Sequence, residues 1–474
     1  MYQRFYTAML IVSSVALLIF TLIAGYREMT PEYRNYKSEY RELFINRATG
    51  EFMKKKAESI DFSVQQVYLG RLNRIDRCIN CHLGVENPLM EDAEVPFKMH
   101  SGNYLETHPV AEFGCTVCHY GQGRATNAED AHGTDRETHW DWPILPLKYI
   151  ESACAQCHDP EMLAENGSDK VLKGEKQFVE KGCRGCHKVN GVGGVLGKAL
   201  DGIGTQPRAY FPMRYVKGDK TAYTWLKEHF DDPRALVPES EMRIVLLKDE
   251  DADLLTTYIL TIRADEMPRD YRRIGTATKK VPDGEELYKM YCIACHTTGK
   301  YSVYDEIFNR TIPAIMNPAF LRVADDNQIR RFIEDGRANT QMTDWKEDAA
   351  GLTDDEIGRI VGFLAKSRPA KSNKPFGRSI LDGDTARGRD IYEVRCALCH
   401  GEDGMGGKNR LGISLITPVV KEADPEFLLQ TVRDGREGTP MLPFGSSGIN
   451  LSDQDILDVV GYVRTIKPAA SPKE

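Results

Sequence analysis

The longest apolar run of the chain covers residues 7–26, TAMLIVSSVALLIFTLIAGY, and contains no charged side chain. A helix of this length can cross a hydrocarbon core of about 30 Å. We therefore predict one transmembrane helix within residues 1–28. A cleaved signal peptide is the alternative, although the run is long for one. Because Arg4 precedes the run and a long charged segment follows it, we expect the N-terminus inside and the rest of the chain outside.

Residues 29–70 are rich in charge and carry Tyr33, Tyr36 and Tyr40 at helical spacing. This pattern predicts a juxtamembrane helical segment. Two roles for the tyrosines stay open at this point. They can lie at the lipid headgroups or against a partner helix, or they can pack on their own domain.

Farther along, one pattern of apolar and polar positions occurs three times. Each copy begins with an amphipathic segment, GEKQFVEKG at residue 174, GEELYKMY at 284 and GRDIYEVR at 388. Five residues before the next cysteine lie Phe178, Leu287 and Ile391, and four residues before it lie Val179, Tyr288 and Tyr392. Each copy ends in a second segment, over residues 246–260, 352–364 and 451–463, with matching aromatic positions at Tyr258, Phe363 and Tyr462. The pattern predicts three helical repeats.

Two of the closing segments start with helix-capping residues. Thr353 with Glu356 forms a capping box, and Ser452 is a suitable N-cap three residues before Asp455. We therefore expect helices to begin at these two positions.

All 12 cysteines of the 474 residues fall into Cys-x-x-Cys-His motifs. The six copies are Cys78/Cys81/His82, Cys115/Cys118/His119, Cys154/Cys157/His158, Cys183/Cys186/His187, Cys292/Cys295/His296 and Cys396/Cys399/His400. Two thiols at this spacing form thioethers with the vinyl groups of haem, and the adjacent histidine binds the iron from one face. A zinc knuckle, a redox dithiol or a disulfide framework explains one copy but not six with no cysteine left over. We predict six covalently bound c-type haems.

The spacing of the motifs divides the chain. The first three motifs have fewer than about forty residues each, too few for a polypeptide core, so residues 71–168 are predicted to form a trihaem domain packed on its haems with little regular structure. The last three have roughly a hundred residues each, which is the size of a one-haem domain. We predict monohaem domains at residues 169–265, 282–367 and 384–467, joined by linkers at 266–283 and 366–384. The fold class is mainly α.

Residues 170–467 resemble class I cytochrome c three times over. The resemblance rests on a helix that leads into each motif, a later methionine, and a closing helix with an aromatic contact. GRANTQM and GREGTPM place a methionine before the closing helix of the fifth and sixth domains, and PESEMR does so in the fourth. The resemblance implies Met242, Met342 and Met441 as distal iron ligands. Met213, Met316 and Met405 are the local competitors, and His229 is an alternative for the fourth haem, although we expect it at the surface.

The trihaem domain offers histidines in place of methionines. Four histidines outside the motifs lie between residues 100 and 139, where three haems need distal ligands. We predict His108, His132 and His139 as these ligands and regard His100 as a spare. The order of the residues does not say which histidine serves which haem.

Residues 60–160 resemble the multihaem c-type segments found with membrane quinol-oxidising complexes. The motifs that carry this resemblance are DRCINCHLGVENP, HPVAEFGCTVCHYGQGRATNAEDAHG, HWDWPIL and ESACAQCH. It implies a subunit that takes electrons from a cytochrome b, a Rieske-type or another quinol-oxidising subunit and passes them to a soluble cytochrome c. The location implied is the cytoplasmic membrane, with one pass through the lipid and the haem domains on the periplasmic side.

Charge and ligand type add to this interpretation. The net charge of −8 and the lack of a basic stripe give no support for nucleic-acid binding. Haems bound by two histidines should have lower potentials than haems bound by histidine and methionine, which favours electron flow outward from quinol. Three other functions stay open: a stand-alone anchored shuttle, a reductase with an open haem, and an extracellular haem polymer.

Overall fold

The computed structural model describes residues 2–29, 31–133, 140–243, 249–272, 281–337, 340–370, 376, 379–406, 412–437 and 439–467. The chain divides into two compact units. The first contains residues 1–169, 206–228 and 265–275, and the second contains residues 170–205, 229–264 and 276–474. The predicted fold class, mainly α, is confirmed: the four described strands have three residues each.

The first unit starts with α1 (Tyr2–Met29). Its residues 3–26 have a mean hydropathy of 2.5 and are not buried against the protein. By length and composition this helix is able to cross a membrane, a test that a signal sequence also passes. The predicted apolar N-terminal helix is therefore present.

The juxtamembrane segment folds as two helices, α2 (Tyr33–Arg47) and α3 (Glu51–Glu58). The ring of Tyr40 packs against Phe44 and Phe97, and its hydroxyl accepts a hydrogen bond of 2.9 Å from Asn87 Nδ2. Tyr36 also contacts Phe97. The structure thus favours the second role for the tyrosines, because they pack on their own domain.

The rest of the first unit consists of short elements. The pair β1 (Val67–Leu69) and β2 (Arg74–Asp76) is antiparallel, with Tyr68 opposite Ile75. The helices that follow are α4 (Tyr104–Thr107), α5 (Val110–Phe113), α6 (Thr116–His119), α7 (Ala128–His132), α8 (Glu151–Cys154), α9 (Pro160–Glu165) and, partly in this unit, α11 (Ala222–Asp231). Such short elements agree with a domain that depends on cofactors for its core.

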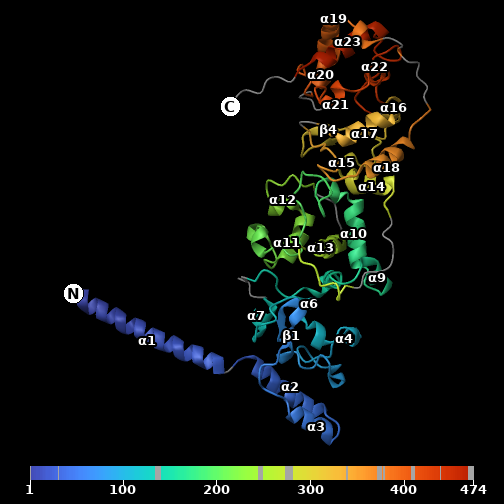
Figure 1. Ribbon diagram of the computed structural model, residues 1–474. Helices are drawn as coiled ribbons and strands as arrows, with labels where there is room; N and C mark the ends of the chain where they lie inside the picture. The colour runs from blue at the N-terminus through green and yellow to red at the C-terminus, as the bar shows by residue number, and fades with distance from the viewer. Residues whose placement is uncertain are drawn as a thin grey trace. The chain divides into compact units, whose positions relative to one another are not determined.

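The second unit contains the three predicted helical repeats (Figure 1). Each repeat crosses one opening and one closing helix: α10 (Lys170–Glu180) with α13 (Asp249–Ile259), α14 (Gly284–Tyr291) with α18 (Asp354–Ala365), and α19 (Thr385–Arg395) with α23 (Asp453–Thr465). An aromatic pair marks each crossing, with ring centres 5.2 Å apart for Phe178–Tyr258, 5.6 Å for Tyr288–Phe363 and 5.4 Å for Tyr392–Tyr462. The predicted aromatic contact is confirmed.

A glycine lies four residues before the first aromatic ring of each pair. A Cβ atom on Gly174, Gly284 or Gly388 would lie 2.2, 2.0 or 2.0 Å from a main-chain oxygen of the closing helix. The three oxygens belong to Leu254, Arg359 and Asp458, which lie four residues before the second ring. Because a side chain here would force the helices apart, glycine is required at all three crossings.

The fourth domain differs from the other two by two residues, Lys181 and Gly182, between helix and motif. Helix α10 ends at Glu180, and Gly182 adopts a φ of 67° before Cys183, whereas α14 and α19 run directly to Cys292 and Cys396. The pairing ring is therefore Phe178, five residues before its cysteine, instead of the residue four before it.

The remaining described elements of the second unit surround these helix pairs. They are α12 (Pro233–Leu236), α15 (Ile293–His296), β3 (Val303–Asp305) paired antiparallel with β4 (Arg310–Ile312), α16 (Pro318–Val323), α17 (Asp326–Glu334), α20 (Ala397–His400), α21 (Pro418–Lys421) and α22 (Pro425–Asp434). The capping boxes predicted at Thr353 and Ser452 are both present.

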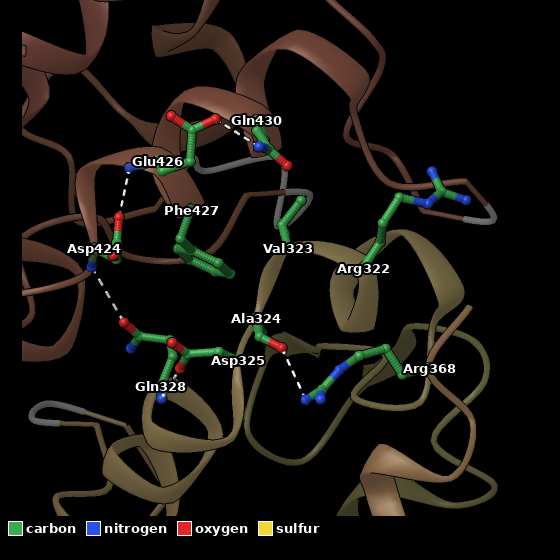
Figure 2. A pocket seen from close by; sticks show the side chains of 10 residues that line it. All are labelled: Arg322, Val323, Ala324, Asp325, Gln328, Arg368, Asp424, Glu426, Phe427 and Gln430. Atoms are coloured by element: carbon green, nitrogen blue, oxygen red, sulfur yellow. Dashed lines mark hydrogen bonds between the residues drawn. The ribbon is translucent and has the colours of Figure 1, made fainter. Parts of the chain in front are cut away.

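The fifth and sixth domains share a core. Ala423 and Phe427 of the sixth belong to the same buried cluster as Phe320 and Phe332 of the fifth. A polar pocket lies beside this contact, where the main-chain N–H of Asp424 donates to Gln328 Oε1 at 3.2 Å and Arg368 donates to the Ala324 carbonyl (Figure 2). The two domains therefore pack as one body on the side shown there.

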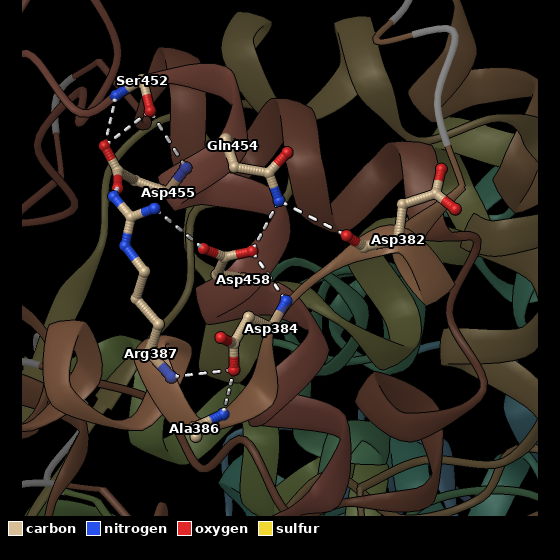
Figure 3. A network of polar contacts seen from close by, with 8 residues as sticks. All are labelled: Asp382, Asp384, Ala386, Arg387, Ser452, Gln454, Asp455 and Asp458. Atoms are coloured by element: carbon tan, nitrogen blue, oxygen red, sulfur yellow. Dashed lines mark hydrogen bonds and ion pairs between the residues drawn. The ribbon is translucent and has the colours of Figure 1, made fainter.

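Polar contacts tie the two helices of the sixth domain together (Figure 3). The buried carboxylate of Asp458 accepts hydrogen bonds from the Asp384 N–H at 2.8 Å and from Gln454 Nε2 at 2.7 Å. Arg387 pairs with both Asp455 and Asp458. This network fixes the start of α19 on α23, and with it the approach to the sixth motif.

Candidate haem sites

All six Cys-x-x-Cys-His motifs adopt the same tight turn. The histidine N–H donates to the carbonyl of the first cysteine at 2.9–3.1 Å, in the pairs His82–Cys78, His119–Cys115, His158–Cys154, His187–Cys183, His296–Cys292 and His400–Cys396. The N–H of the second cysteine donates to the same carbonyl at 3.1–3.2 Å, from Cys81, Cys118, Cys157, Cys186, Cys295 and Cys399. No disulfide joins any two of the twelve described cysteines. The turn brings two sulfur atoms and one imidazole close together, as attachment of a haem requires.

In the second unit a main-chain carbonyl orients each motif imidazole. Nδ1 of His187, His296 and His400 lies 2.7, 3.1 and 2.9 Å from the carbonyl oxygens of Lys198, Pro313 and Ile413. A carbonyl accepts only, so Nδ1 carries the hydrogen and Nε2 is left free to bind iron.

Burial keeps these motif imidazoles neutral. It lowers the pKa of His187 and His400, and lowers that of His296 to about 4. An uncharged ring presents a lone pair at neutral pH, which is the form that binds a metal.

In the first unit each motif imidazole faces a second imidazole. The ring centres are 6.0 Å apart for His82–His132, 6.1 Å for His119–His100 and 5.9 Å for His158–His108. Two rings bound through Nε2 to opposite faces of one metal, with metal–nitrogen bonds of about 2 Å, have centres roughly 6 Å apart. The three pairs therefore fit three irons with two histidine ligands each.

This geometry can be compared with the predicted distal ligands. His108 and His132 lie where a distal ligand is needed, as expected. The third place is taken by His100, which the sequence interpretation treated as a spare. His139 lies outside the described residues.

Asp76 joins the first two motifs. Its carboxylate accepts hydrogen bonds from the main-chain N–H groups of Cys78 at 3.1 Å, Cys115 at 2.8 Å and Thr116 at 2.8 Å. Burial acts to raise the pKa of Asp76, but the hydrogen bonds from Thr116, Cys78 and Cys115 outweigh it and the pKa is lowered. The thiols of Cys78 and Cys115 lie within 4.8 Å of each other and of this carboxylate, so two haem attachment points are adjacent.

The second and third motifs are adjacent as well. Gln156, inside the third motif, donates to the carbonyl of Val117, inside the second, at 3.2 Å. The Cys118 thiol interacts electrostatically with Cys154 and Cys157. The three attachment points of the first unit therefore form a continuous series.

The fourth and fifth motifs meet in the second unit. A Cβ atom on Gly185, inside the fourth motif, would lie 3.3 Å from the Cβ of Ala294, inside the fifth, and the thiols of Cys186 and Cys295 interact electrostatically. Arg243, next to Met242, binds the carbonyl of Ala294 inside the fifth motif and pairs with buried Asp305. Here too, two haem attachment points are adjacent.

The second cysteine of the sixth motif, Cys399, differs from its counterpart Cys295 in its surroundings. Cys295 lines a cavity of about 330 Å³, whereas Cys399 does not line that cavity, although Gly412 and Ile413 beside the sixth motif do. The Cys399 thiol is half-buried and interacts electrostatically with Cys396 of its own motif. A Cβ on Gly412 would lie 2.2 Å from the Cys399 carbonyl oxygen, so Gly412 closes directly over the motif.

Residues 407–411, which lie between the sixth motif and Gly412, are outside the described part of the chain. Attachment of a haem at Cys399 stays a prediction, which rests on the motif turn that this cysteine shares with the other five.

The three predicted methionines occupy equivalent loops. The N–H of Met242, Met342 and Met441 donates to a hydroxyl two residues earlier, on Ser240 at 3.2 Å, Thr340 at 3.1 Å and Thr439 at 3.1 Å. In the fifth domain Met342 lines the cavity of about 330 Å³ together with Cys292, Cys295 and His296. The structure thus brings this methionine to the cavity in which a distal ligand is needed.

One expectation is corrected. His229 is not a surface residue but partly buried, with its Nδ1 atom inaccessible to solvent. Burial and the nearby His187 lower its pKa to about 4. The fourth domain therefore has two candidates for the distal ligand, Met242 and His229.

Sequence reasoning missed two arginines at the fifth and sixth sites. Arg337 and Arg436 line the cavity of Met342, and each lies five residues before the predicted methionine of its own domain. The shared letters of GRANTQM and GREGTPM were a usable signal. For Asp76 the sequence offers a weaker signal, namely that it lies two residues before Cys78.

Two protein-family models match this chain. The model for "Cytochrome C oxidase, cbb3-type, subunit III" matches residues 279–364 and 383–463, and the model for "Cytochrome c" matches residues 171–263. Both matches lie in the region where the structure has the three crossed helix pairs. The chain therefore contains cytochrome c domains, which carry covalently bound c-type haem.

Several similar curated proteins are described as cytochrome c or oxidase subunits. The cbb3-type cytochrome c oxidase subunit CcoP of Azospirillum sp. is 24% identical over 48% of this chain and 75% of its own length. The cytochrome bc1 complex cytochrome c subunit of Corynebacterium diphtheriae is 24% identical over 40% and 68%. The cytochrome c subunit of the quinone-linked alcohol dehydrogenase of Gluconacetobacter polyoxogenes is 24% identical over 42% and 51%.

Among solved structures, a chain of the reducing HAO-like protein complex of Kuenenia stuttgartiensis covers 40% of this chain and 98% of its own. It is 21% identical with a TM-score of 0.29, too low for a structural comparison. From the family models and the curated relatives, the chain is a multihaem c-type cytochrome of electron transport, with an apolar N-terminal helix that suits a membrane anchor.

Proposed function

We propose that this chain is a hexahaem cytochrome that carries electrons from a membrane quinol-oxidising core to a periplasmic acceptor such as a soluble cytochrome c. The observation that carries the proposal is the contact between successive haem motifs: first with second, second with third, and fourth with fifth. Haem supplies reversible one-electron chemistry when it is bound. The residues of the chain hold and orient the six cofactors and exclude water from them.

The supply of candidate ligands supports conduction over catalysis. Each motif histidine of the first unit has a second imidazole about 6 Å away, and Met342 lines one cavity with His296, so these residues would hold a bound haem iron from two sides. A reductase needs an open iron with reactive side chains above it. In each of the first three sites, a histidine would take the place of such an open position.

The change of ligand type along the chain supports a direction. The histidine-paired sites belong to the unit that carries the membrane helix, and the methionine loops belong to the other. Two histidines favour a lower potential than histidine and methionine. Electrons would therefore enter at the first unit and leave from the second.

The proposed partners follow from the relatives. Two are described as cytochrome c subunits of a bc1 complex and a cbb3-type oxidase, and a third belongs to a quinone-linked dehydrogenase. For this chain we propose a cytochrome b and a Rieske-type or other quinol-oxidising subunit, with the haem domains on the periplasmic side. A stand-alone anchored shuttle is the second candidate, because α1 alone can hold the chain at a membrane.

Purification of the full chain from membranes in mild detergent, followed by identification of the proteins that co-purify, separates these candidates. A cytochrome b with a Rieske protein supports the proposal, and recovery of the chain alone favours the shuttle. The haem-to-protein ratio should be six. Binding of carbon monoxide by the ferrous protein would contradict the conduit, since a six-coordinate haem resists this ligand while an open one takes it readily.

A further inference from the structure

The haem cavity of the fifth domain is completed by the sixth. Met405, Gly412 and Ile413 of the sixth domain line the cavity that contains His296 and Met342. The carbonyl of Ile413 is also the acceptor for Nδ1 of His400, at 2.9 Å. Ile413 therefore supports the sixth motif histidine through its carbonyl and also lines the fifth haem cavity.

Arg337 and Arg436 lie in equivalent places in the two domains. The main-chain N–H of each donates at 2.8 Å to the carbonyl of its methionine, Met342 or Met441. Both side chains line the same cavity. An arginine of the sixth domain thus reaches the haem site of the fifth.

Three phenylalanines hold these guanidinium groups. Phe320, Phe332 and Phe427 form a buried cluster with ring centres 5.9–6.1 Å apart. Arg337 lies over Phe332 at 5.1 Å, and Arg436 lies over Phe320 at 4.9 Å and over Phe427 at 5.7 Å. The cluster contains residues of both domains, so it brings the two cations together at the junction.

Two partly buried like charges in one cavity favour a bound anion. Burial lowers the pKa of Arg337 to about 10, and burial together with the charge of Arg337 lowers the pKa of Arg436 to about 10. Both groups remain cationic at neutral pH, and burying unpaired cations is costly. The Nε atom of Arg436 is buried without a hydrogen-bond partner.

The neighbouring carboxylates do not supply that anion. Asp335 pairs with Lys346 at 2.8 Å, Glu334 with Arg330 at 3.2 Å and Asp434 with Arg433 at 3.3 Å. Within the described residues, neither arginine forms an ion pair with a carboxylate. The anion must come from outside the polypeptide.

We infer that Arg337 and Arg436 form one shared cation pair that binds the propionate groups of the fifth and sixth haems at the junction between their domains. Propionates are the anionic groups of haem, and the planar guanidinium suits bidentate binding of a carboxylate. The inference rests on the proposed haem content of these two domains. Because reduction adds an electron to each site, a buried cation pair raises the potentials of both haems.

The test replaces each arginine in the full chain, as Arg337→Gln and Arg436→Gln. Arg389→Gln is the matched control: this arginine lies on the exposed side of α19 and pairs with Glu393 at 2.8 Å. The readout is a spectroelectrochemical titration of the haems. Each cavity variant should lower the midpoint potentials of both the fifth and the sixth haem, and the control should leave all potentials in place.

Arg337→Lys and Arg436→Lys keep the charge and lose the bidentate geometry, so they should restore most of the lost potential if the variants fold. A shift confined to the haem of the mutated domain, or no shift in either haem, would overturn the shared pair. The haem-to-protein ratio is measured on the same samples. A ratio below six in the unmodified chain counts against the proposed function, whereas a full ratio with unshifted potentials counts against the cation pair alone.

Discussion

At the scale of single residues, the haem sites depend on a few buried polar side chains with defined partners. His82, His119 and His158 each face a second imidazole at about 6 Å, and Asp76 joins the loops of two motifs. Burial lowers the pKa of His82 and His119, assisted by the facing His132 and His100. His82 and His119 are therefore neutral and available to iron at physiological pH.

His100 provides the sharpest residue-level prediction. It faces His119 at 6.1 Å, and its Nδ1 lies 2.9 Å from the Ser101 carbonyl, which leaves Nε2 free. Replacement by leucine should open the second haem, so that the ferrous protein binds one carbon monoxide per chain where the unmodified protein binds none.

His139→Leu is the control for this change. Since His100 already occupies the position opposite His119, the variant should show the spectrum of the unmodified chain. An open haem in His139→Leu, together with an unchanged His100→Leu protein, would restore the ligand set that the sequence favoured.

At the scale of secondary structure, one packing solution occurs three times. A glycine on the opening helix contacts a carbonyl of the closing helix, and aromatic rings meet one turn later. The sixth domain adds the Asp458 network to the same crossing (Figure 3). The glycines set how closely the helices approach, and the haem motif follows directly from the opening helix.

Gly284→Ala should weaken this crossing in the fifth domain. The added Cβ would lie 2.0 Å from the Arg359 carbonyl, and such overpacking costs about 1–3 kcal/mol. Peptides covering 284–291 and 354–365 should then exchange their amide hydrogens about 5- to 150-fold faster by mass spectrometry.

Gly362→Ala is the matched control within the same helix pair. No atom lies within 4 Å of a Cβ at Gly362, which is exposed on α18. Alanine should slow exchange slightly, since glycine in a helix costs roughly 0.5–1 kcal/mol relative to alanine. Equal slowing in both variants would show that helix propensity, and not the close approach, governs this site.

At the scale of the whole molecule, the two units differ in the ligands they offer to iron. The first unit presents imidazole pairs, and the second presents methionine loops with a cation pair at one junction. Both differences act in the same direction, toward higher potentials in the second unit.

A redox titration that resolves the haems should therefore give two groups, with the histidine-paired haems at lower potential. Met342→His should move one haem from the upper group to the lower. Met316→Leu, at a competing methionine of the same domain, should leave the titration unchanged. A flat or reversed order of potentials in the unmodified chain would remove the proposed direction of electron flow.

Much of this organisation could be predicted from local sequence. The apolar run of residues 7–26 predicted a helix by length alone, and the capping boxes at Thr353 and Ser452 depend on residues three positions apart. The repeated methionines also lie in repeated loops. Such features can be predicted because each depends on residues that are close together in the sequence.

Other features could not be predicted because they depend on distant segments. His100 faces His119 because of the way residues 82–132 fold around the second motif. His229 is partly buried by packing that no local sequence pattern predicts. Glycine was visible in all three opening segments, but the carbonyl that each one meets lies in another helix.

The sequence by itself determined the number and chemistry of the attachment motifs, the membrane-length helix and the repeat of cytochrome c domains, because covalent attachment and helical periodicity are local. Only the tertiary structure decided which imidazole faces which motif, which attachment cysteines are adjacent, and that Arg337 and Arg436 meet in one cavity. Those pairings are set by long-range packing, in which a residue's partner depends on how whole domains fold and dock.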